Sequence, residues 1–350
     1  MIVNASTLSG DNLEQIEESH ITIEGGLITE VADGYSTGAV DCRKYLAAPS
    51  LFNAHTHVGD SFAKEAVFGM NASQAVGKDG AKWGIYPHSS PQERVDSMED
   101  SMAYMLSSGT TSFADFRENG LEGIAELKKA AESIKIKPVI LGRNVSEKEC
   151  DGLGLNLYQE GQIPEPREKI LALHAGESEG EVERALKHNP DVIIHYTKAS
   201  KEEIRIAARK NISIVVCPRS NSCLQAGFPD VRGMLDAGVN VSLGTDNVMI
   251  NQPNMFREME YLSKASLLQG SMLSPQEVFA LSSRNGAKAF RKNSGTIKKG
   301  ADADIMFLDK NAPTLKGSKN LLASIVHRCE PENVRKVLVD GLFAVDKDKK

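Results

Sequence analysis

The sequence lacks the features that mark membrane, secreted and nucleic-acid-binding proteins. No apolar run approaches the roughly 20 residues that span a bilayer, and the acidic N-terminal stretch has no basic segment of the kind that opens a signal peptide. The net charge of −6 argues against a surface for nucleic acid. The five cysteines are scattered, with no Cys-x-x-Cys pair. We therefore expect reduced thiols and a cytoplasmic protein that binds neither membrane nor nucleic acid.

The composition that is present is ordinary for a soluble globular protein. Hydrophobic residues make up 41% of the chain and charged residues 25%. A length of 350 residues is enough for one large α/β barrel or for two ordinary domains. Composition therefore leaves the fold to be decided by the order of the elements.

Strand-like and helix-like segments alternate through the middle of the chain. Ser90-Pro-Gln-Glu93 and Ser274-Pro-Gln-Glu277 are capping boxes, so each predicts the start of a helix. Eight strands alternating with helices favour a (β/α)8 TIM barrel. The predicted strands, the fourth being the weakest, are Leu51–Ala54, Thr110–Ala114, Lys137–Gly142, Gly152–Asn156, Ile170–His174, Val192–His195, Ile212–Cys217 and Asn240–Gly244.

The two ends of the chain have a different pattern. Around Gly25-Gly26, apolar and polar residues alternate, which predicts a β-hairpin. Residues 297–309 and 334–345 are similar in character. The pattern leaves two interpretations open, because these strands are either separate edges or one small β domain built from both ends.

Polar side chains follow the predicted strands at their carboxyl ends, where barrels carry their functional groups. Alternate residues of a strand share a face, so His55 and His57 would point the same way. Four of the eight histidines fall at strand ends, and a set of neutral imidazoles with a carboxylate suits zinc or iron. The strand-end residues are His55, His57, Asp115, Arg117, Arg143, Asn144, His174, Glu177, His195, Asp246 and Asn247.

These motifs together resemble the amidohydrolase superfamily, in particular its cytosine deaminase, chlorohydrolase and S-adenosylhomocysteine deaminase branch. The resemblance implies a barrel at 49–296 and a small β-sandwich domain from 1–48 plus 297–350. The matching stretches run through nearly the whole chain and are Asn53-Ala-His-Thr-His57, Ser108-Gly-Thr-Thr-Ser-Phe-Ala-Asp115, Leu173-His-Ala-Gly-Glu177, Cys217-Pro-Arg-Ser-Asn221, Gly244-Thr-Asp246 and Gly300-Ala-Asp-Ala-Asp304.

The resemblance also implies the roles of the site residues. One divalent metal ion, zinc or iron, would be bound by His55, His57, His174 and Asp246. The catalytic residues would be Glu177, His195 and Asp246. Asp246 would accept a proton from water, His195 would stabilise the tetrahedral intermediate, and Glu177 would carry protons to the ring and to the departing ammonia.

The sequence departs from the superfamily pattern around the fourth strand. Some members bind two metals through a carbamylated lysine there, and Gly152-Leu-Gly-Leu-Asn156 has no lysine, so we expect one metal. The substrate-binding histidine that nucleoside-deaminating relatives usually carry in this region is also missing. The segment from Arg143 to Ile170 is compressed, which predicts an altered pocket wall.

We therefore expect a metal-dependent hydrolase that deaminates an amino-substituted heterocycle such as a nucleobase, nucleoside or pterin. The nearest alternative is hydrolysis of a cyclic or exocyclic amide by the same hydroxide, dechlorination is a weaker one, and a non-catalytic scaffold is the alternative of another class. The substrate is a small molecule, and the sequence leaves open its identity and whether the protein forms a homo-oligomer. The candidate substrate contacts are Trp83, Arg117, Arg143, Arg219, Asn221 and Asn247. We expect at least one of the three arginines to face an anionic group on the substrate.

Overall fold

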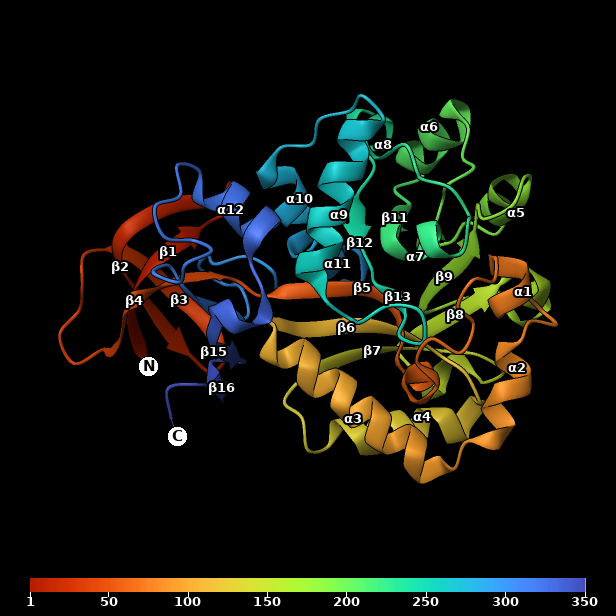
Figure 1. The fold of residues 1–350 in the computed structure, drawn as a ribbon, viewed down its shortest axis with the longest axis horizontal. Helices are drawn as coiled ribbons and strands as arrows, with labels where there is room; N and C mark the ends of the chain where they lie inside the picture. The colour runs from red at the N-terminus through yellow and green to blue at the C-terminus, as the bar shows by residue number, and fades with distance from the viewer. Residues whose placement is uncertain (350) are drawn as a thin grey trace.

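The computed structural model describes residues 1–349 and contains two sheets, of nine and seven strands (Figure 1). In the view of Figure 1 the seven-stranded sheet lies at the left and the nine-stranded sheet with its surrounding helices at the right. Both chain termini lie on the side of the seven-stranded sheet.

The nine-stranded sheet is parallel and curls on itself. Its strand order is β12-β11-β10-β9-β8-β7-β6-β5-β13. Because β13 follows β12 in the chain and pairs with β5, the two edges meet and form a TIM-like barrel. All eight predicted strands are confirmed as β5 Leu51–His57, β6 Thr110–Arg117, β7 Lys137–Gly142, β8 Gly152–Asn156, β9 Ile170–Ala175, β10 Val192–His195, β11 Ser213–Val216 and β12 Val241–Leu243, with β13 at Asp246–Asn247.

Helices cover the outside of the barrel. Both predicted capping boxes are confirmed, because the Ser90 and Ser274 side chains accept from the third backbone N–H of α3 and α10. The β5–α3 connection holds the short helices α1 Ala72–Val76 and α2 Lys82–Ile85. The longer outer helices are α3 Pro91–Ser107, α4 Gly120–Ala131, α5 Glu181–Lys187, α6 Lys201–Arg209, α7 Pro218–Cys223, α8 Val231–Asp236, α9 Met255–Leu268, α10 Pro275–Leu281 and α11 Arg284–Ala289.

The segment between β7 and β9 is as short as the sequence predicts. It contains β8 and two 3₁₀ turns, Glu147–Glu149 and Leu157–Gln162, where other parts of the barrel have α-helices. Residues of the second turn reach the mouth of the barrel, so this connection forms part of the cavity wall.

Strands from both ends of the chain form the seven-stranded sheet, in the order β16-β15-β14-β4-β1-β2-β3. Antiparallel pairing of β4 with β14 joins the two ends, and the hairpin at Gly25-Gly26 is confirmed between β2 and β3. The strands are β1 Ile2–Ser9, β2 Glu14–Glu24, β3 Leu27–Asp33, β4 Val40–Pro49, β14 Ile305–Asp309, β15 Val334–Val339 and β16 Leu342–Asp346; helix α12 Leu321–Arg328 precedes β15.

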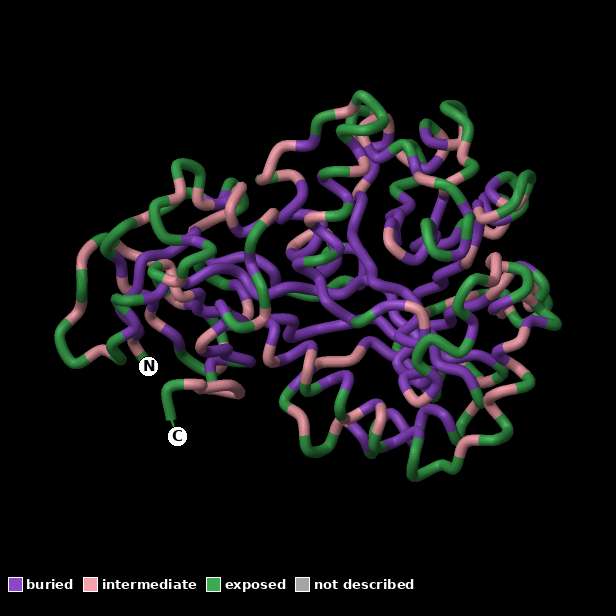
Figure 2. Tube along the Cα trace, viewed as in Figure 1, coloured by how far each residue is buried: buried purple, intermediate pink, exposed green. Residues whose placement is uncertain are grey.

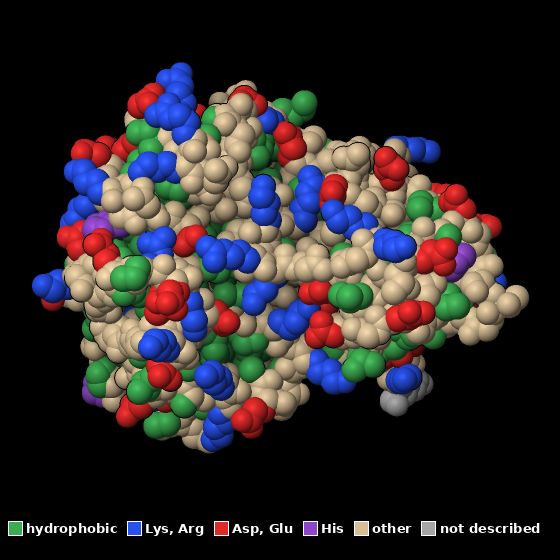
Figure 3. All heavy atoms as spheres, turned by 180° about the vertical axis from the view of Figure 1, so that it is seen from behind, with side chains coloured by type: hydrophobic (Ala, Val, Ile, Leu, Met, Phe, Trp, Pro, Cys, Tyr) green, Lys and Arg blue, Asp and Glu red, His purple; other side chains and the backbone are tan. Residues whose placement is uncertain are grey.

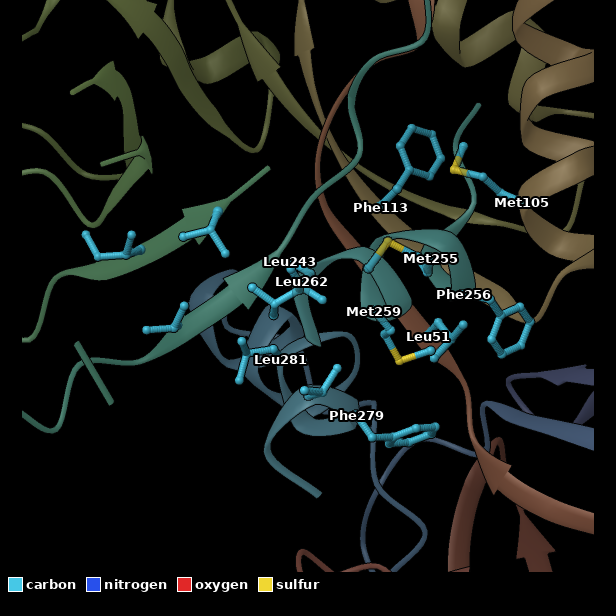
Figure 4. Packing of buried hydrophobic residues seen from close by; sticks show 14 of the residues in the cluster. Leu51, Met105, Phe113, Leu243, Met255, Phe256, Met259, Leu262, Phe279 and Leu281 are labelled. Carbon is cyan, nitrogen blue, oxygen red and sulfur yellow. The ribbon is translucent and has the colours of Figure 1, made fainter. Parts of the chain in front are cut away.

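Burial is greatest along the barrel strands, and the outer turns of the helices are exposed (Figure 2). Figure 4 shows part of this core, where Met259 of α9 lies beside Leu51 of β5; Met255, Phe256 and Leu281 belong to the same apolar cluster. Complete burial of such a side chain contributes about 1.5–3 kcal/mol. This packing holds β5, which carries two of the site histidines, in a fixed position.

The surface is mixed in charge. Figure 3 shows lysine and arginine interspersed with aspartate and glutamate over the face opposite to that of Figure 1. Within residues 1–349, the search for a helix both long and apolar enough to cross a membrane finds none.

Candidate metal centre and active site

Histidines from three strands meet at the mouth of the barrel. His55 and His57 end β5, while His174 and His195 lie at the carboxyl ends of β9 and β10. Asp246 begins β13, beside β5. Carboxyl ends of parallel barrel strands share one rim, so side chains that are up to 191 positions apart in sequence become neighbours.

The distances between these side chains define a compact cluster. His55 Nε2 lies 3.1 Å from Asp246 Oδ1 and 3.1 Å from His174 Nε2. His57 Nε2 lies 3.6 Å from the same Asp246 oxygen. One atom each from His55, His174, His195 and Asp246 all lie within 4.8 Å of one another. The structure thus brings together all four predicted metal ligands and His195.

Hydrogen bonds on the outer nitrogens fix the tautomers of three histidines. His57 Nδ1 is 2.8 Å from Glu118 Oε1, and His174 Nδ1 is 2.7 Å from the side-chain Oδ1 of Asn156. His195 Nδ1 is 2.8 Å from the side-chain Oδ1 of Asn221. These oxygens can only accept, so each Nδ1 carries the hydrogen. The Nε2 lone pairs are consequently left facing the centre of the cluster.

The protonation states suit a cation. Burial lowers the pKa of His55 and of His174, and lowers that of His57 to about 3, so these imidazoles are neutral at pH 7. Burial opposes ionisation of Asp246, but its hydrogen bond to His55 and the neighbouring histidines outweigh burial, and the pKa of Asp246 is lowered. Converging lone pairs around an ionised carboxylate are the donor set that zinc prefers.

Two residues of the cluster have unusual backbone conformations. His195 has φ +76° and Asp246 has φ +61°, both in the left-handed region that costs a non-glycine residue energy. The surroundings hold Asp246 in place, because Ser220 of α7 donates to its second carboxylate oxygen. Gly244 has no room for a side chain, since a Cβ there would lie 2.7 Å from His55 Cβ.

Glu177 enters the site on the turn that follows β9. The Glu181 carboxylate accepts the backbone N–H groups of Gly176, Glu177 and Ser178 at 2.9, 3.0 and 3.1 Å, which fixes this turn. Gly176 has φ +98°, and a Cβ there would lie 2.8 Å from Tyr196 Cα. The turn therefore requires glycine before Glu177.

The Glu177 carboxyl group lies next to His195. Its Oε1 is 3.8 Å from His195 Nε2 and, within the described chain, is buried without a hydrogen-bond partner. Burial raises the pKa of Glu177, with His195 opposing the rise. Burial lowers the pKa of His195, but Glu177 and Asp246 outweigh it and the net shift is upward. The pair can hold and move a proton at the edge of the cluster.

A cavity of about 310 Å³ opens over the cluster. Three of the predicted substrate contacts, Trp83, Arg143 and Asn247, line it together with His57, His174, Glu177, His195 and Asp246. The remaining wall comes from the β5–α3 connection, the β7–β9 connection and helix α5, and includes Val76, Lys82, Asn156, Leu157, Tyr158 and Arg184.

The structure places the other three predicted substrate contacts outside the lining of this cavity. Arg117 is fully buried in ion pairs with Asp115 and Glu118, at 3.4 and 3.3 Å. Arg219 pairs with Glu258 at 3.5 Å. Asn221 is buried and holds His195. All three contact neighbouring protein groups, and the pairing of Arg117 with Asp115 and Glu118 is the alternative that the sequence also offered for the arginines.

Four polar residues that the sequence analysis did not select support the site. Glu118 accepts from His57, Lys82 bridges Glu118 and Asp60, and Asn156 holds His174. Burial opposes the charges, but Lys82, His57 and Arg143 lower the pKa of Glu118 well below its usual range, and the two carboxylates raise that of Lys82. Glu118 directly follows β6 and Asn156 ends β8, so their positions could have identified them, whereas Lys82 gives no sequence signal.

The fold and the site define a class of protein: a closed parallel barrel with a histidine–carboxylate cluster at the carboxyl ends of its strands. The model of the amidohydrolase family matches residues 46–190 and 165–343 of the sequence. The chain belongs to the amidohydrolase family, as its motifs predicted.

Individual proteins agree with this membership. A protein of Methanothermobacter thermautotrophicus is 30% identical over 97% of this chain and 98% of its own length. A 5-methylthioadenosine/S-adenosylhomocysteine deaminase of Thermococcus sibiricus is 26% identical over 97% of this chain and 92% of its own length. The crystal structure of an adenosine deaminase of Xanthomonas campestris with bound zinc superposes with a TM-score of 0.81 at 18% identity, covering 99% of this chain and 93% of the other.

Proposed function

We propose that the protein is a zinc-dependent hydrolase that removes an amino group, as ammonia, from a small heterocycle. The observation that carries this proposal is the position of Glu177 beside the converging histidines, with its carboxyl Oε1 buried and without a hydrogen-bond partner in the described residues. A metal site alone would suit many reactions. A proton carrier held next to it suits the loss of a basic amine.

We propose that His55, His57, His174 and Asp246 hold one divalent metal ion. When bound, such an ion acts as a Lewis acid that lowers the pKa of water and supplies a nucleophile near neutral pH. Asp246 Oδ1 accepts a proton at the cluster, and His195 Nε2 faces the cavity, where it can contact the oxygen that adds to the ring carbon. Glu177 protonates a ring nitrogen and then the leaving amine.

The zinc-bound adenosine deaminase and the methylthioadenosine deaminase support deamination over the amide-hydrolysis alternative. The two reactions differ in their products, since deamination releases ammonia whereas opening of a cyclic amide creates a carboxylate without it. Asn156 stands on β8, where the sequence lacks the histidine expected of nucleoside deaminases, and it holds His174. We therefore favour a free heterocycle over a nucleoside.

The test is ammonia release by the zinc-loaded protein from purines, pyrimidines, pterins and nucleosides, with elemental analysis of the purified chain. We expect about one zinc or iron per chain and ammonia from at least one class. His55→Ala should lose metal and activity together. Two metals per chain would contradict the mononuclear site, and carboxylate formation without ammonia would favour the amide hydrolase.

We further propose the division of the chain into a barrel at 49–296 and a small β-sandwich domain from 1–48 plus 297–350. Pairing of β4 with β14 supports it, as does the separate apolar cluster that Val3, Ile21 and Tyr45 share with Ile305 and Phe307.

A further inference from the structure

Two buried cations face the cavity, and the carboxylates that pair with them do not. Lys82 of α2 is 4% exposed and Arg143 after β7 is 3% exposed, yet both line the cavity. Their partners Asp60 and Glu118 are also buried but lie outside its lining. A ligand in the cavity therefore meets the cationic side of this cluster first.

Both cations have hydrogen-bond donors to spare. The Lys82 ammonium has three N–H groups, of which two go to Asp60 Oδ2 at 2.6 Å and Glu118 Oε1 at 2.7 Å. Across residues 1–349 the third has no acceptor. Trp83 lies alongside, with its ring centroid 5.1 Å from Lys82 Nζ.

The Arg143 guanidinium is only partly satisfied. Its Nε donates to the Gly154 carbonyl at 2.7 Å and its Nη1 to Glu118 Oε1 at 3.2 Å. Its Nη2 lies 3.2 Å from His174 Nδ1. That nitrogen already carries a hydrogen, which it donates to Asn156, so it cannot accept from Arg143. The Nη2 group is thus a buried donor without an acceptor in the part of the chain described.

We propose that Lys82 and Arg143 form a subsite for an acidic group on the substrate, so that the enzyme acts on an amino-substituted heterocycle that carries a carboxylate. This inference rests on the proposed function. Both side chains contact the same oxygen of Glu118, which places them side by side. A carboxylate has two oxygens with which to accept from two such donors.

The position of Arg143 limits where the acidic group sits on the substrate. Arg143 contacts His174, whose other ring nitrogen faces the metal cluster. The subsite and the reacting carbon are therefore separated by about one aromatic ring. In a cavity of about 310 Å³ the acid must be attached to the ring directly or through a short substituent, and a phosphate at the end of a nucleotide is too distant.

The experiment compares matched pairs of compounds, pterin-6-carboxylate with pterin and 5-carboxycytosine with cytosine. Ammonia release gives kcat/KM, and calorimetric titration of zinc-loaded and metal-free protein gives the binding constant independently of turnover. We expect at least one acidic compound to bind about 10²-fold more tightly than its neutral partner, in line with two charge-assisted hydrogen bonds. Preferences within threefold in both pairs would overturn the proposal.

Variants at Lys82 test the assignment. Lys82→Met should reduce the preference for the acid about tenfold or more, and Lys82→Arg should restore most of it. Because Lys82→Met leaves Asp60 buried without its cation, whereas Glu118 keeps Arg117 and Arg143, the double variant Lys82→Met/Asp60→Asn provides a second, charge-balanced test. Lys64→Met, at an exposed lysine outside the cavity, is the matched control. A double variant that keeps the full preference overturns the subsite.

The outcomes also separate this inference from the proposed function. Acid-selective binding without ammonia release would retain the subsite and remove the deaminase. Ammonia release from neutral and acidic compounds alike, with equal binding, would retain the deaminase and remove the subsite.

Discussion

The carboxyl group of Glu177 is the part of the site that a single-atom change tests best. Glu177→Gln keeps the size of the side chain but cannot deliver a proton. The residue is outside the proposed ligand set, so metal content should stay normal. We expect kcat to fall by at least about 10²-fold, the usual range for loss of general acid–base catalysis. Steady-state ammonia release and elemental analysis on the same preparation provide the measurement.

The pH profile gives this prediction its control. Burial raises the pKa of Glu177, so the carboxyl group stays protonated to a higher pH than usual and the acid is lost as pH rises through that pKa. The wild-type rate should show this descending limb, and Glu177→Gln should lack it. Glu179→Gln, an exposed neighbour, should behave as wild type. Near-normal kcat in Glu177→Gln would remove Glu177 from the mechanism.

At the scale of the element, the turn between β9 and α5 positions the Glu177 side chain. Three backbone N–H groups converge on one Glu181 oxygen. In Glu181→Gln the acceptor loses its charge, and hydrogen bonds to charged groups are worth about 1.5–3 kcal/mol each. We expect kcat to fall about tenfold through misplacement of the acid, while metal content and the pH limb persist.

Glu183→Gln is the matched control for that turn. Glu183 lies on the same helix and pairs with Lys187 on the surface, with 73% of its side chain exposed. Its loss should leave kcat within about twofold, as exposed pairs contribute little. Equal effects from the two variants would contradict a specific role for Glu181.

The secondary-structure elements also show how much of the fold could be predicted from the sequence. Apolar runs and capping boxes are local signals, and they predicted all eight barrel strands and the starts of α3 and α10. The family resemblance implied the ligand set of His55, His57, His174 and Asp246, and barrel topology explains why these strand ends lie together. Lys82 could not be predicted, since its pairing with Asp60 and Glu118 depends on how an irregular connection folds back.

The dependence on tertiary packing also explains why three of the predicted substrate contacts lie outside the cavity. Arg117, Arg219 and Asn221 all follow predicted strands, so their positions in sequence were equivalent to that of Arg143. What separates them is their partners, and Arg117 alone needs the space left by Gly59, where a Cβ would lie 1.7 Å from its guanidinium. Three-dimensional packing decides which arginine faces a ligand and which is enclosed.

At the scale of the whole molecule, Lys137 joins the barrel to the terminal strands. It begins β7 and lies in ion-pair contact with the fully buried Asp304, and its Nζ is 3.0 Å from Asp340. Lys137→Met leaves Asp304 buried without its cation, and breaking such a pair costs about 3–5 kcal/mol. We expect the free energy of unfolding in urea to fall by about 3 kcal/mol, with metal content unchanged.

An exposed pair supplies the control for this joint. Lys298 and Asp11 pair at 2.9 Å with about half of each side chain exposed. Lys298→Met should cost less than about 1 kcal/mol. If the two lysine variants lose equal stability, the joint between the barrel and the terminal sheet does not depend on Lys137.

Strand β13 is only two residues long, yet Asp246 pairs with Thr56 and Asn247 with His57, so it closes the barrel beside the proposed metal ligands. The contact between β13 and β5 therefore both closes the barrel and positions two of the proposed metal ligands. A metal ion bound by both Asp246 and His55 would hold β13 against β5, so its binding free energy would also stabilise the closed barrel.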